Sequence, residues 1–401
     1  MARLADIVRR SDETIARSFQ ATPATNEERR AWWATRDVLD AQLGRLCSDL
    51  QSVLGGFRVL LQGVRVDDDD DRPDVRGVQS AVNTAVAALK GSRVSAVSMQ
   101  LCALFAELGP DATDRELRDV LSAFAPGFDD DEYSRVLPDF TASFTRAVST
   151  ASTEEAPLRH HVVLVLDRHV QRFPWESLPC LSVSSVSRLP TLAFLRDRLS
   201  LHSDGVAEAD GQSAYYVINA SRDLGETQTR LEPSLVRCGF VGVAGRPPTQ
   251  DEWMRAVTMH DVFLYMSHGS GMQYVRYEKL LAPNQSAEKG RQAAVAVLMG
   301  CQSGHLRDQG EFDPAGDALY YLYAGSPAVV GTLWDVTSID IDMFTAEMLR
   351  LWGLVPDEEG ERDECMLTVA VAEARVVCRY KYLNAGAVVV YGLPVILSRR
   401  D

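Results

Sequence analysis

The sequence predicts an α/β protein in which a doubly wound, mainly parallel sheet, flanked by helices, follows an all-helical region. Two observations lead to this prediction. In the first 150 residues or so, apolar residues recur at the spacing of a helix. Beyond that point, short and continuously apolar runs alternate with helix-like stretches, which is typical of strands buried on both faces of a parallel sheet. We therefore expect a helical region over residues 1–155 and a sheet-containing domain over residues 156–401.

A long amphipathic helix is expected near the start of the helical region. Apolar residues recur every three or four positions through residues 29–61, and the pair Gly55-Gly56 predicts where the helix ends, because glycine permits a left-handed exit. The next stretch, residues 65–76, has five consecutive aspartates and a proline. Such a charge run predicts a solvated, flexible acidic insert.

Two further helices are expected in this region, over residues 81–108 and 114–124. The second has Asp111 or Thr113 as its N-cap candidate. A second acidic cluster, at residues 129–132, lacks the alternating oxygen ligands and the central glycine of a calcium loop, so no calcium site is predicted there.

The sheet-containing domain is predicted from its alternating pattern. Short β-rich apolar runs occur at residues 161–166, 215–219, 262–266, 294–299, 328–334 and 388–391. Helix-like stretches occur at residues 249–257, 314–324, 339–351 and 366–382. Because ligands and catalysis gather at the carboxyl ends of the strands in such sheets, chemistry is expected at that edge.

Composition narrows the classes of function. The 401 residues include 41 Lys+Arg and 56 Asp+Glu, a net charge of −15, which argues against nucleic acid as a partner because duplex binding needs a basic surface. No apolar run reaches the roughly 18 residues that span a bilayer, so no membrane contact is expected. The seven cysteines are scattered without a CxxC pair, which predicts neither a disulfide framework nor a zinc site, and favours a reducing compartment.

Two predicted strands are followed by reactive side chains. The run at residues 262–266 leads into Ser-His268-Gly269-Ser-Gly, and the run at 294–299 leads into Gly-Cys301-Gln-Ser-Gly. If the strands are neighbours, His268 and Cys301 emerge side by side, as thiol catalysis requires. The backbone N–H groups of Gly269 and Cys301 would then face a developing oxyanion. The spacing alone leaves a structural role open, because cysteine is often buried and a strand-end glycine often only makes a turn.

Several blocks resemble the protease region of separase, a member of the caspase-like clan of cysteine peptidases. Three of them surround the reactive residues: DVFLYMSHGSG at 261–271, AVAVLMGCQSGHL at 294–306 and GTLWDVTSIDID at 331–342. Further blocks follow the order of the family, at residues 32–61, 171–192, 216–228 and 372–397. The resemblance covers residues 30–401, except for about 65–150, and implies a caspase-like fold for residues 156–401.

The resemblance also implies roles for particular residues. His268 matches the general base and Cys301 the nucleophile, while the amides of Gly269 and Cys301 match the oxyanion hole. Asp335 falls where the family has the carboxylate that pairs with the substrate's P1 arginine, and a carboxylate suits a guanidinium. A structural alternative for Asp335 is the N-cap of the predicted helix 339–351, a position for which Thr337 competes.

The function implied is cleavage after arginine in a Glu-x-x-Arg motif of the kleisin subunit of cohesin, which releases sister chromatids in anaphase. Securin is the implied inhibitory partner, and the implied location is the cytoplasm and nucleus, on mitotic chromosomes. Neither a cofactor nor a metal is expected. One alternative is a latent caspase-like binding module held by an inhibitory partner. Another, a caspase-like peptidase with a bacterial scaffold role, predicts no similarity outside the His-Gly and Gly-Cys blocks.

Two residues depart from the family pattern. Gln302 follows the nucleophile where a serine is usual, and Ser338 stands where an acidic residue is common. Gln302 is expected to affect the cleavage rate or the shape of a subsite. His305, four residues after Cys301, would share a helix face with it and so make a metal pair, although a locally satisfied histidine is the favoured interpretation.

Overall fold

The computed structural model describes residues 1–20, 25–65, 72–89, 97–149, 159–202, 204–282, 292–356 and 365–398. The run of five aspartates lies outside the described residues. The chain divides into two compact units. The sheet unit comprises Met1–Cys47, Val163–Leu178 and Ser185–Asp401, and the helical unit comprises Ser48–Val162 and Pro179–Ser184. The first 47 residues therefore group with the sheet, whereas the sequence predicts a division after residue 155.

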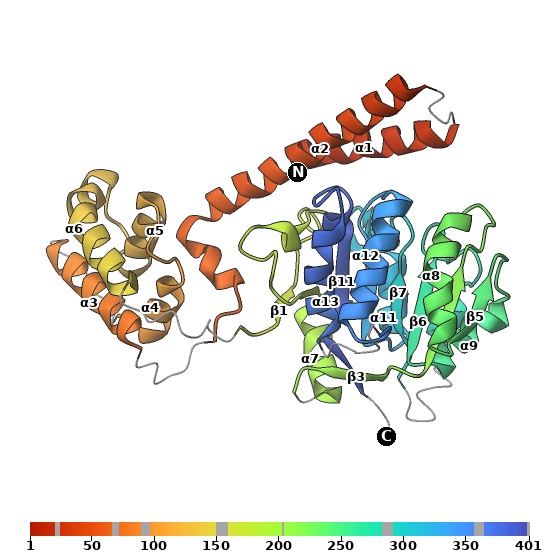
Figure 1. The fold of residues 1–401 in the computed structure, drawn as a ribbon. Coiled ribbons are helices and arrows are strands. Elements are labelled where there is room, and N and C mark those ends of the chain that lie inside the picture. Colours follow the sequence, from red (N-terminus) through yellow and green to blue (C-terminus); the bar gives the residue numbers. More distant parts are fainter. Residues whose placement is uncertain are drawn as a thin grey trace. The chain divides into compact units, whose positions relative to one another are not determined.

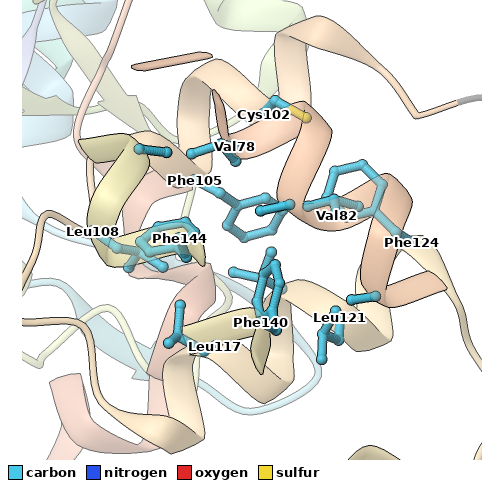
Figure 2. Close-up of a cluster of buried hydrophobic side chains, with 14 of the residues drawn as sticks. Val78, Val82, Cys102, Phe105, Leu108, Leu117, Leu121, Phe124, Phe140 and Phe144 are labelled. Atoms are coloured by element: carbon cyan, nitrogen blue, oxygen red, sulfur yellow. The ribbon is translucent and has the colours of Figure 1, made fainter. Parts of the chain in front are cut away.

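The helical unit is built around one apolar core. Its helices are η1 (Gly55–Leu61), α3 (Pro73–Ala88), α4 (Met99–Ala106), α5 (Asp114–Phe124) and α6 (Asp130–Ser149). Each helix contributes buried aromatic or aliphatic side chains, and the close-up shows those of α3 to α6 converging on one another (Figure 2). The ring centroids of Phe105 and Phe124 lie 5.9 Å apart in an edge-to-face arrangement, which is a favourable geometry for aromatic pairs.

Most of the predicted helix ends in this unit are confirmed. Helix α2 (Asn26–Leu54) ends directly before Gly55, whose φ is +54°. Thr113 caps α5 through a capping box with Glu116, as one of the two predicted candidates. The acidic cluster at 129–132 also has a structural role, because Asp129 and Glu132 accept hydrogen bonds from each other's backbone N–H at 2.9 and 3.0 Å and so cap α6.

Two predictions in this unit were wrong. The helix expected over residues 81–108 is two helices, α3 and α4. The expected loop over residues 65–76 ends earlier than predicted, because α3 begins at Pro73. Proline is well suited to the first turn of a helix, where its missing N–H would have no partner. The proline therefore marks the start of a helix rather than the continuation of a loop.

The sheet unit contains an eight-stranded sheet in the order β1-β2-β11-β10-β7-β6-β4-β5 (Figure 1). Five neighbouring strands, β10 to β5 in this order, run parallel, and β11 is antiparallel to β10. The strand bounds are β1 (Val162–Leu164), β2 (Val186–Arg188), β4 (Ala214–Ile218), β5 (Val241–Ala244), β6 (Val262–Met266), β7 (Val295–Leu298), β10 (Ala328–Thr332) and β11 (Val388–Gly392). The predicted mixed α/β fold with a mainly parallel sheet is confirmed.

Helices flank this sheet, and α8, α12 and α13 lie side by side in Figure 1. The helices are α7 (Leu192–Leu201), α8 (Gly225–Arg237), α9 (Gln250–Met259), α10 (Tyr277–Leu281), α11 (Asp317–Tyr323), α12 (Ser338–Leu351) and α13 (Leu367–Ala374), with short 3-10 turns η2 (Trp175–Ser177), η4 (Arg375–Val377) and η5 (Ala385–Ala387). Two small two-stranded sheets pair β3 (Ala207–Asp210) with β12 (Val395–Ser398), and β8 (Arg307–Gln309) with β9 (Phe312–Ala315).

The helix predicted over residues 366–382 ends early, at Ala374. The backbone N–H groups that would continue the helix bind carboxylates instead. Tyr380 N–H donates to Asp340 at 3.0 Å, and the N–H groups of residues 382 and 383 donate to Asp40 at 2.9 and 2.8 Å. These buried polar contacts explain why the chain leaves the helical path.

An N-terminal hairpin, α1 (Ala2–Gln20) with the first part of α2, packs against this non-helical segment. Arg36 is fully buried, and its guanidinium donates to Ser11 Oγ and to Asn384 Oδ1, each at 3.2 Å. A Cβ on Gly44 would lie 2.6 Å from the Tyr382 ring. The close packing holds α1 beside the loop that follows β10.

Candidate active site

The strands that precede the two reactive residues are neighbours, which is the condition under which the sequence places His268 and Cys301 side by side. β6 and β7 pair in parallel, with Val262 opposite Val295 and Tyr265 opposite Leu298. Their carboxyl ends therefore meet at one edge of the sheet. His268 lies two residues after β6, and Cys301 lies three residues after β7.

Gly300 brings these two segments into contact. A Cβ placed on this glycine would lie 2.3 Å from the carbonyl oxygen of Ser267 and 2.0 Å from that of Gly269, distances that no real side chain tolerates. The residue before Cys301 therefore touches the backbone on both sides of His268. Gly269 itself has a φ of +67°, a conformation that glycine adopts at little cost. The close contact between the two segments is thus at Gly300, whereas Gly269 has no atom within 4 Å of its Cβ position and serves the turn.

His268 is held by contacts on both its ring and its backbone. Its Nε2 lies 2.9 Å from Oδ2 of Asp223, and its carbonyl oxygen accepts a hydrogen bond of 2.6 Å from the buried Tyr265 hydroxyl. The ring is 40% exposed, so substrate can reach it. Asp223 was not among the residues predicted from the sequence, because an aspartate in a loop after a strand gives no signal that separates it from an ordinary surface residue.

The loop that presents Asp223 is itself ordered by a buried asparagine. Asn219, at the end of β4, has a φ of +53°, a left-handed conformation that asparagine tolerates. Its Oδ1 accepts from the N–H of Leu224 at 2.8 Å, and its Nδ2 donates to Gln228 at 2.8 Å. These bonds fix the backbone on one side of Asp223 and so direct its carboxylate toward His268.

Cys301 lies partly buried on the turn that follows β7. Burial, together with the nearby negative charge of Asp335, raises the pKa of the Cys301 thiol to about 11, and a contact with the backbone of Val336 opposes that rise. The Sγ atom lies 3.7 Å from the carbonyl oxygen of Val336. The turn that presents the cysteine is fastened to β10, because Thr332 Oγ1 donates to Gly300 O at 2.8 Å and the N–H of Thr332 donates to Ser303 Oγ at 3.0 Å.

Asp335 follows β10 and lies within hydrogen-bond distance of Gln302, the residue after Cys301. Its Oδ1 accepts a bond of 2.9 Å from Nε2 of Gln302. The alternative role as a helix cap was wrong. The residue at the N-cap position of α12 is Thr337, and its hydroxyl accepts from Asn384 Nδ2 at 2.7 Å rather than capping the helix. The Asp335 carboxylate is thus available at the edge of the site.

Helix α1 contributes a second carboxylate, which the sequence did not suggest. Asp12 is partly buried, and burial, followed by the charge of Asp335, raises its pKa to about 7. The backbone N–H of Asp335 donates to this carboxyl group, which opposes that rise. Its Oδ1 is buried without a hydrogen-bond partner in the structure. A single polar residue on an amphipathic helix offers no sequence signal for such a position.

His305 is a locally satisfied histidine, and the helix that would align it with Cys301 does not form. Residues 301–304 make turns, and Nδ1 of His305 lies 3.1 Å from the carbonyl oxygen of Leu333.

Within the part of the chain that the structure describes, no group of three or more His, Cys, Asp or Glu side chains is arranged to hold a metal ion. In the same part, no helix is long and apolar enough to cross a bilayer. No disulfide joins any of the seven cysteines, all of which lie among the described residues.

Comparison with known proteins identifies a family. Residues 1–341 match the family model described as "Separin, protease domain". The match includes the first 28 residues, which the sequence resemblance had left out. The chain is 34% identical over 391 residues to the separin of Schizosaccharomyces pombe, covering 92% of this chain and 21% of that protein. It is 30% identical over 378 residues to the separin of Mus musculus, covering 92% of this chain and 16% of that protein.

A solved structure has the same fold. The chain superimposes on the crystal structure of the Saccharomyces cerevisiae separase-securin complex with a TM-score of 0.82 and 24% sequence identity, covering 99% of this chain and 28% of that one. The similarity extends across both the helical part and the sheet. The chain spans about a fifth of the length of the curated relatives it matches.

Proposed function

The chain belongs to the separin protease-domain family, and on this premise we propose that it is a cysteine endopeptidase of the separase type with a His268–Cys301 dyad. The observation that supports the dyad best is the contact at Gly300, where a Cβ would overlap the carbonyl oxygens of Ser267 and Gly269. A nucleophile that follows Gly300 directly is within reach of a base that lies between those two carbonyls. Thiol catalysis requires this proximity.

The proposed reaction begins with proton transfer from the Cys301 thiol to His268. The sulfur attacks the scissile carbonyl, whose oxygen becomes an oxyanion held by the N–H groups of Gly269 and Cys301. As the intermediate collapses, His268 returns the proton to the leaving amine and an acyl-enzyme remains. Water then attacks the thioester, again with His268 as base, and the acid product leaves as the thiol reforms.

Asp335 is the proposed determinant of the P1 residue. Its carboxylate is at the edge of the site, and a guanidinium can make two parallel charge-assisted hydrogen bonds to such a group. We propose that cleavage follows arginine in a Glu-x-x-Arg motif. The chain has this pattern itself at residues 132–135 and 359–362.

The proposed substrate is the kleisin subunit of cohesin, and the proposed inhibitory partner is securin. Family membership supports the substrate, and the yeast separase structure of the same fold is that of a separase-securin complex. The proposed place of action is on mitotic chromosomes, and the proposed location is the cytoplasm and nucleus. The proposed domains are a helical region over residues 1–155, of which the first 47 residues group with the sheet unit, and a caspase-like protease domain over residues 156–401.

One observation favours a second candidate, a latent binding module. The Cys301 Sγ faces the carbonyl oxygen of Val336, and its raised pKa keeps the thiol protonated at neutral pH. A chain that stays in this state would bind a partner without cleaving it. An arginyl acyloxymethyl ketone separates the two functions, because an active dyad forms a stable adduct at Cys301 and a latent module does not.

The direct test is cleavage of a fluorogenic peptide that ends in Glu-x-x-Arg. We expect Cys301→Ser and His268→Ala each to lose at least a hundredfold in kcat/KM, since either change removes a reacting group. Cys238→Ser is the matched control, because this cysteine is the C-cap residue of α8 and does not lie on the turn that follows β7. Cleavage by Cys301→Ser at the rate of the unaltered chain would refute the assignment of Cys301 as the nucleophile.

Asp335→Asn should weaken the preference for P1 Arg over P1 Lys. An unchanged preference would refute the role of Asp335 as the determinant of the P1 residue.

A further inference from the structure

Gln302 makes a contact that bears on the choice of substrate. Its Nε2 donates a hydrogen bond of 2.9 Å to Oδ1 of Asp335, the carboxylate proposed for the P1 side chain. The Gln302 side chain is exposed, and Asp335 is partly buried. One oxygen of the proposed P1 carboxylate is therefore already engaged by a neighbouring side chain before any substrate arrives.

The backbone holds Gln302 in this place. Its φ is +57°, a left-handed conformation that is uncommon for a residue with a side chain. The N–H of Gln302 donates to the carbonyl oxygen of Trp334 at 3.4 Å, and its carbonyl oxygen accepts from the N–H of His305 at 3.0 Å. The side chain thus leaves a fixed turn beside Asp335. A serine at this position would be too short to span the same gap with its hydroxyl.

Arginine and lysine side chains are expected to bind the Gln302–Asp335 pair differently. A guanidinium binds a carboxylate best through two parallel N–H···O bonds, which use both oxygens. Arginine must therefore compete with the amide of Gln302 for the lone pairs of Oδ1. A lysine ammonium is a compact point charge that needs one oxygen and can approach Oδ2 while Gln302 keeps its bond.

We propose that Gln302 is a specificity-determining residue that competes with the substrate's guanidinium for Asp335, lowering the affinity for P1 arginine while leaving that for P1 lysine unchanged. The inference rests on the proposed function for the position of the P1 residue. It concerns binding rather than bond cleavage, so it can be measured in a chain that lacks the nucleophile.

The test uses the full chain with Cys301→Ala and two peptides that differ only in Arg or Lys at P1. Calorimetry gives the Kd of each peptide for this chain and for the same chain with Gln302→Ser. We expect Gln302→Ser to lower the Kd of the Arg peptide about three- to tenfold, the effect of one hydrogen bond, and to leave that of the Lys peptide unchanged. An unchanged Arg peptide, an equal gain for both peptides, or no binding of either peptide to any chain would each overturn the proposal.

Two further variants separate the side chain from the backbone. Gln302→Gly removes the amide and also suits the left-handed φ, so it should reproduce the gain of Gln302→Ser for the Arg peptide. If Gly and Ser disagree, the turn rather than the amide is responsible and the proposal fails. Gln309→Ser, at an exposed position on β8, is the control and should change neither Kd. Peptide cleavage is measured in a separate experiment, with the chain in which Cys301 is intact. A chain that fails to cleave would contradict the proposed function, but it would not decide the role of Gln302 in binding.

Discussion

Oδ2 of Asp223 lies 2.9 Å from Nε2 of His268. The bond occupies one ring nitrogen, so Nδ1 is the atom that would exchange a proton with Cys301 in the proposed dyad. A carboxylate on the far side of a catalytic histidine fixes both its tautomer and its orientation in other hydrolases. Asp223 is therefore placed to act as a positioning residue in the proposed peptidase.

Asp223→Asn should lower kcat with little change in KM. Both side chains are substantially exposed, and such pairs are worth about 0.2–1 kcal/mol, so the expected loss is about two- to fivefold. The measurement is steady-state cleavage of the Glu-x-x-Arg peptide. Asp223→Glu keeps the charge and should recover part of the loss. A change confined to KM, or an Asn variant as active as the unaltered chain, would argue that Asp223 does not orient the base.

The Cys301 thiol should react slowly with alkylating agents at neutral pH. Because its pKa is about 11, the thiolate fraction and hence the rate should rise about tenfold per pH unit from pH 7 to pH 10. Mass spectrometry of the peptide that includes Cys301, after short exposure to iodoacetamide, measures this rate. Asp335→Asn removes a nearby negative charge and should shift the curve to lower pH. A rate that is already constant at pH 7 would contradict this description of the free thiol.

Asp12 should make the fold less stable as the pH rises. Its pKa is about 7 in the folded chain against an ordinary value of 3.8, so the unionised form is favoured by folding. The corresponding stability is present below pH 4 and is lost as the pH rises through 7. Asp12→Asn should therefore raise Tm at pH 8 by about 1–2 °C, or about 1 kcal/mol after allowance for solvent screening, and change it little at pH 4.

The control for this change is Asp6→Asn, on the same helix but exposed. It should alter Tm by less than the Asp12 change at pH 8. Thermal unfolding followed by circular dichroism at the two pH values gives the comparison. A Tm shift of the same size at pH 4 and pH 8 would show that the effect of Asp12→Asn does not come from titration of this carboxyl group.

A buried ion pair should make a large contribution to the stability of the sheet unit. The guanidinium of Arg188 binds both carboxylate oxygens of Glu176 at 2.6 Å, and both side chains are 3% exposed. Arg188→Met should cost about 3–5 kcal/mol in the free energy of unfolding, because it leaves a buried charge without its partner. Urea unfolding measures this loss.

The double variant Glu176→Leu with Arg188→Met tests the reason for that loss. Removing both charges leaves no unpaired ion, so the double variant should be more stable than Arg188→Met alone. Arg196→Met, at an exposed pair with Asp197, should change the free energy of unfolding by no more than about 1 kcal/mol. A double variant less stable than the single one would mean that packing, not charge, dominates at this site.

The sequence predicted the strands that matter for the site because they are apolar at every position. β6 was expected at residues 262–266 and occurs there. Five consecutive apolar residues are typical of a strand that is buried on both faces of a sheet. The strands β2 (Val-Ser-Arg) and β5 (Val-Gly-Val-Ala) were missed because polar residues or glycine interrupt them, so neither forms a continuous apolar run. The end of α13 was missed because it depends on Asp40 and Asp340, which lie far away in the sequence.

The same reason explains which site residues could be predicted. His268 and Cys301 each follow a recognisable strand, so their edge of the sheet could be inferred from local patterns. Asp223 lies 45 residues before His268, and Asp12 comes from the first helix. Their positions depend on tertiary contacts such as that of Arg36 with Asn384, 348 residues later. No local pattern encodes such contacts.

The close approach at Gly300 also has a consequence for the time at which activity can begin. The proposed base and the proposed nucleophile follow different strands, and they meet only after β6 and β7 have paired. During synthesis, the His268 segment leaves the ribosome before Cys301 has been translated. In a growing chain, the histidine is therefore made first and the cysteine later. The two form a complete proposed dyad only when residues 295–298 have joined the sheet. In the proposed peptidase, cleavage therefore cannot begin before these two strands have paired.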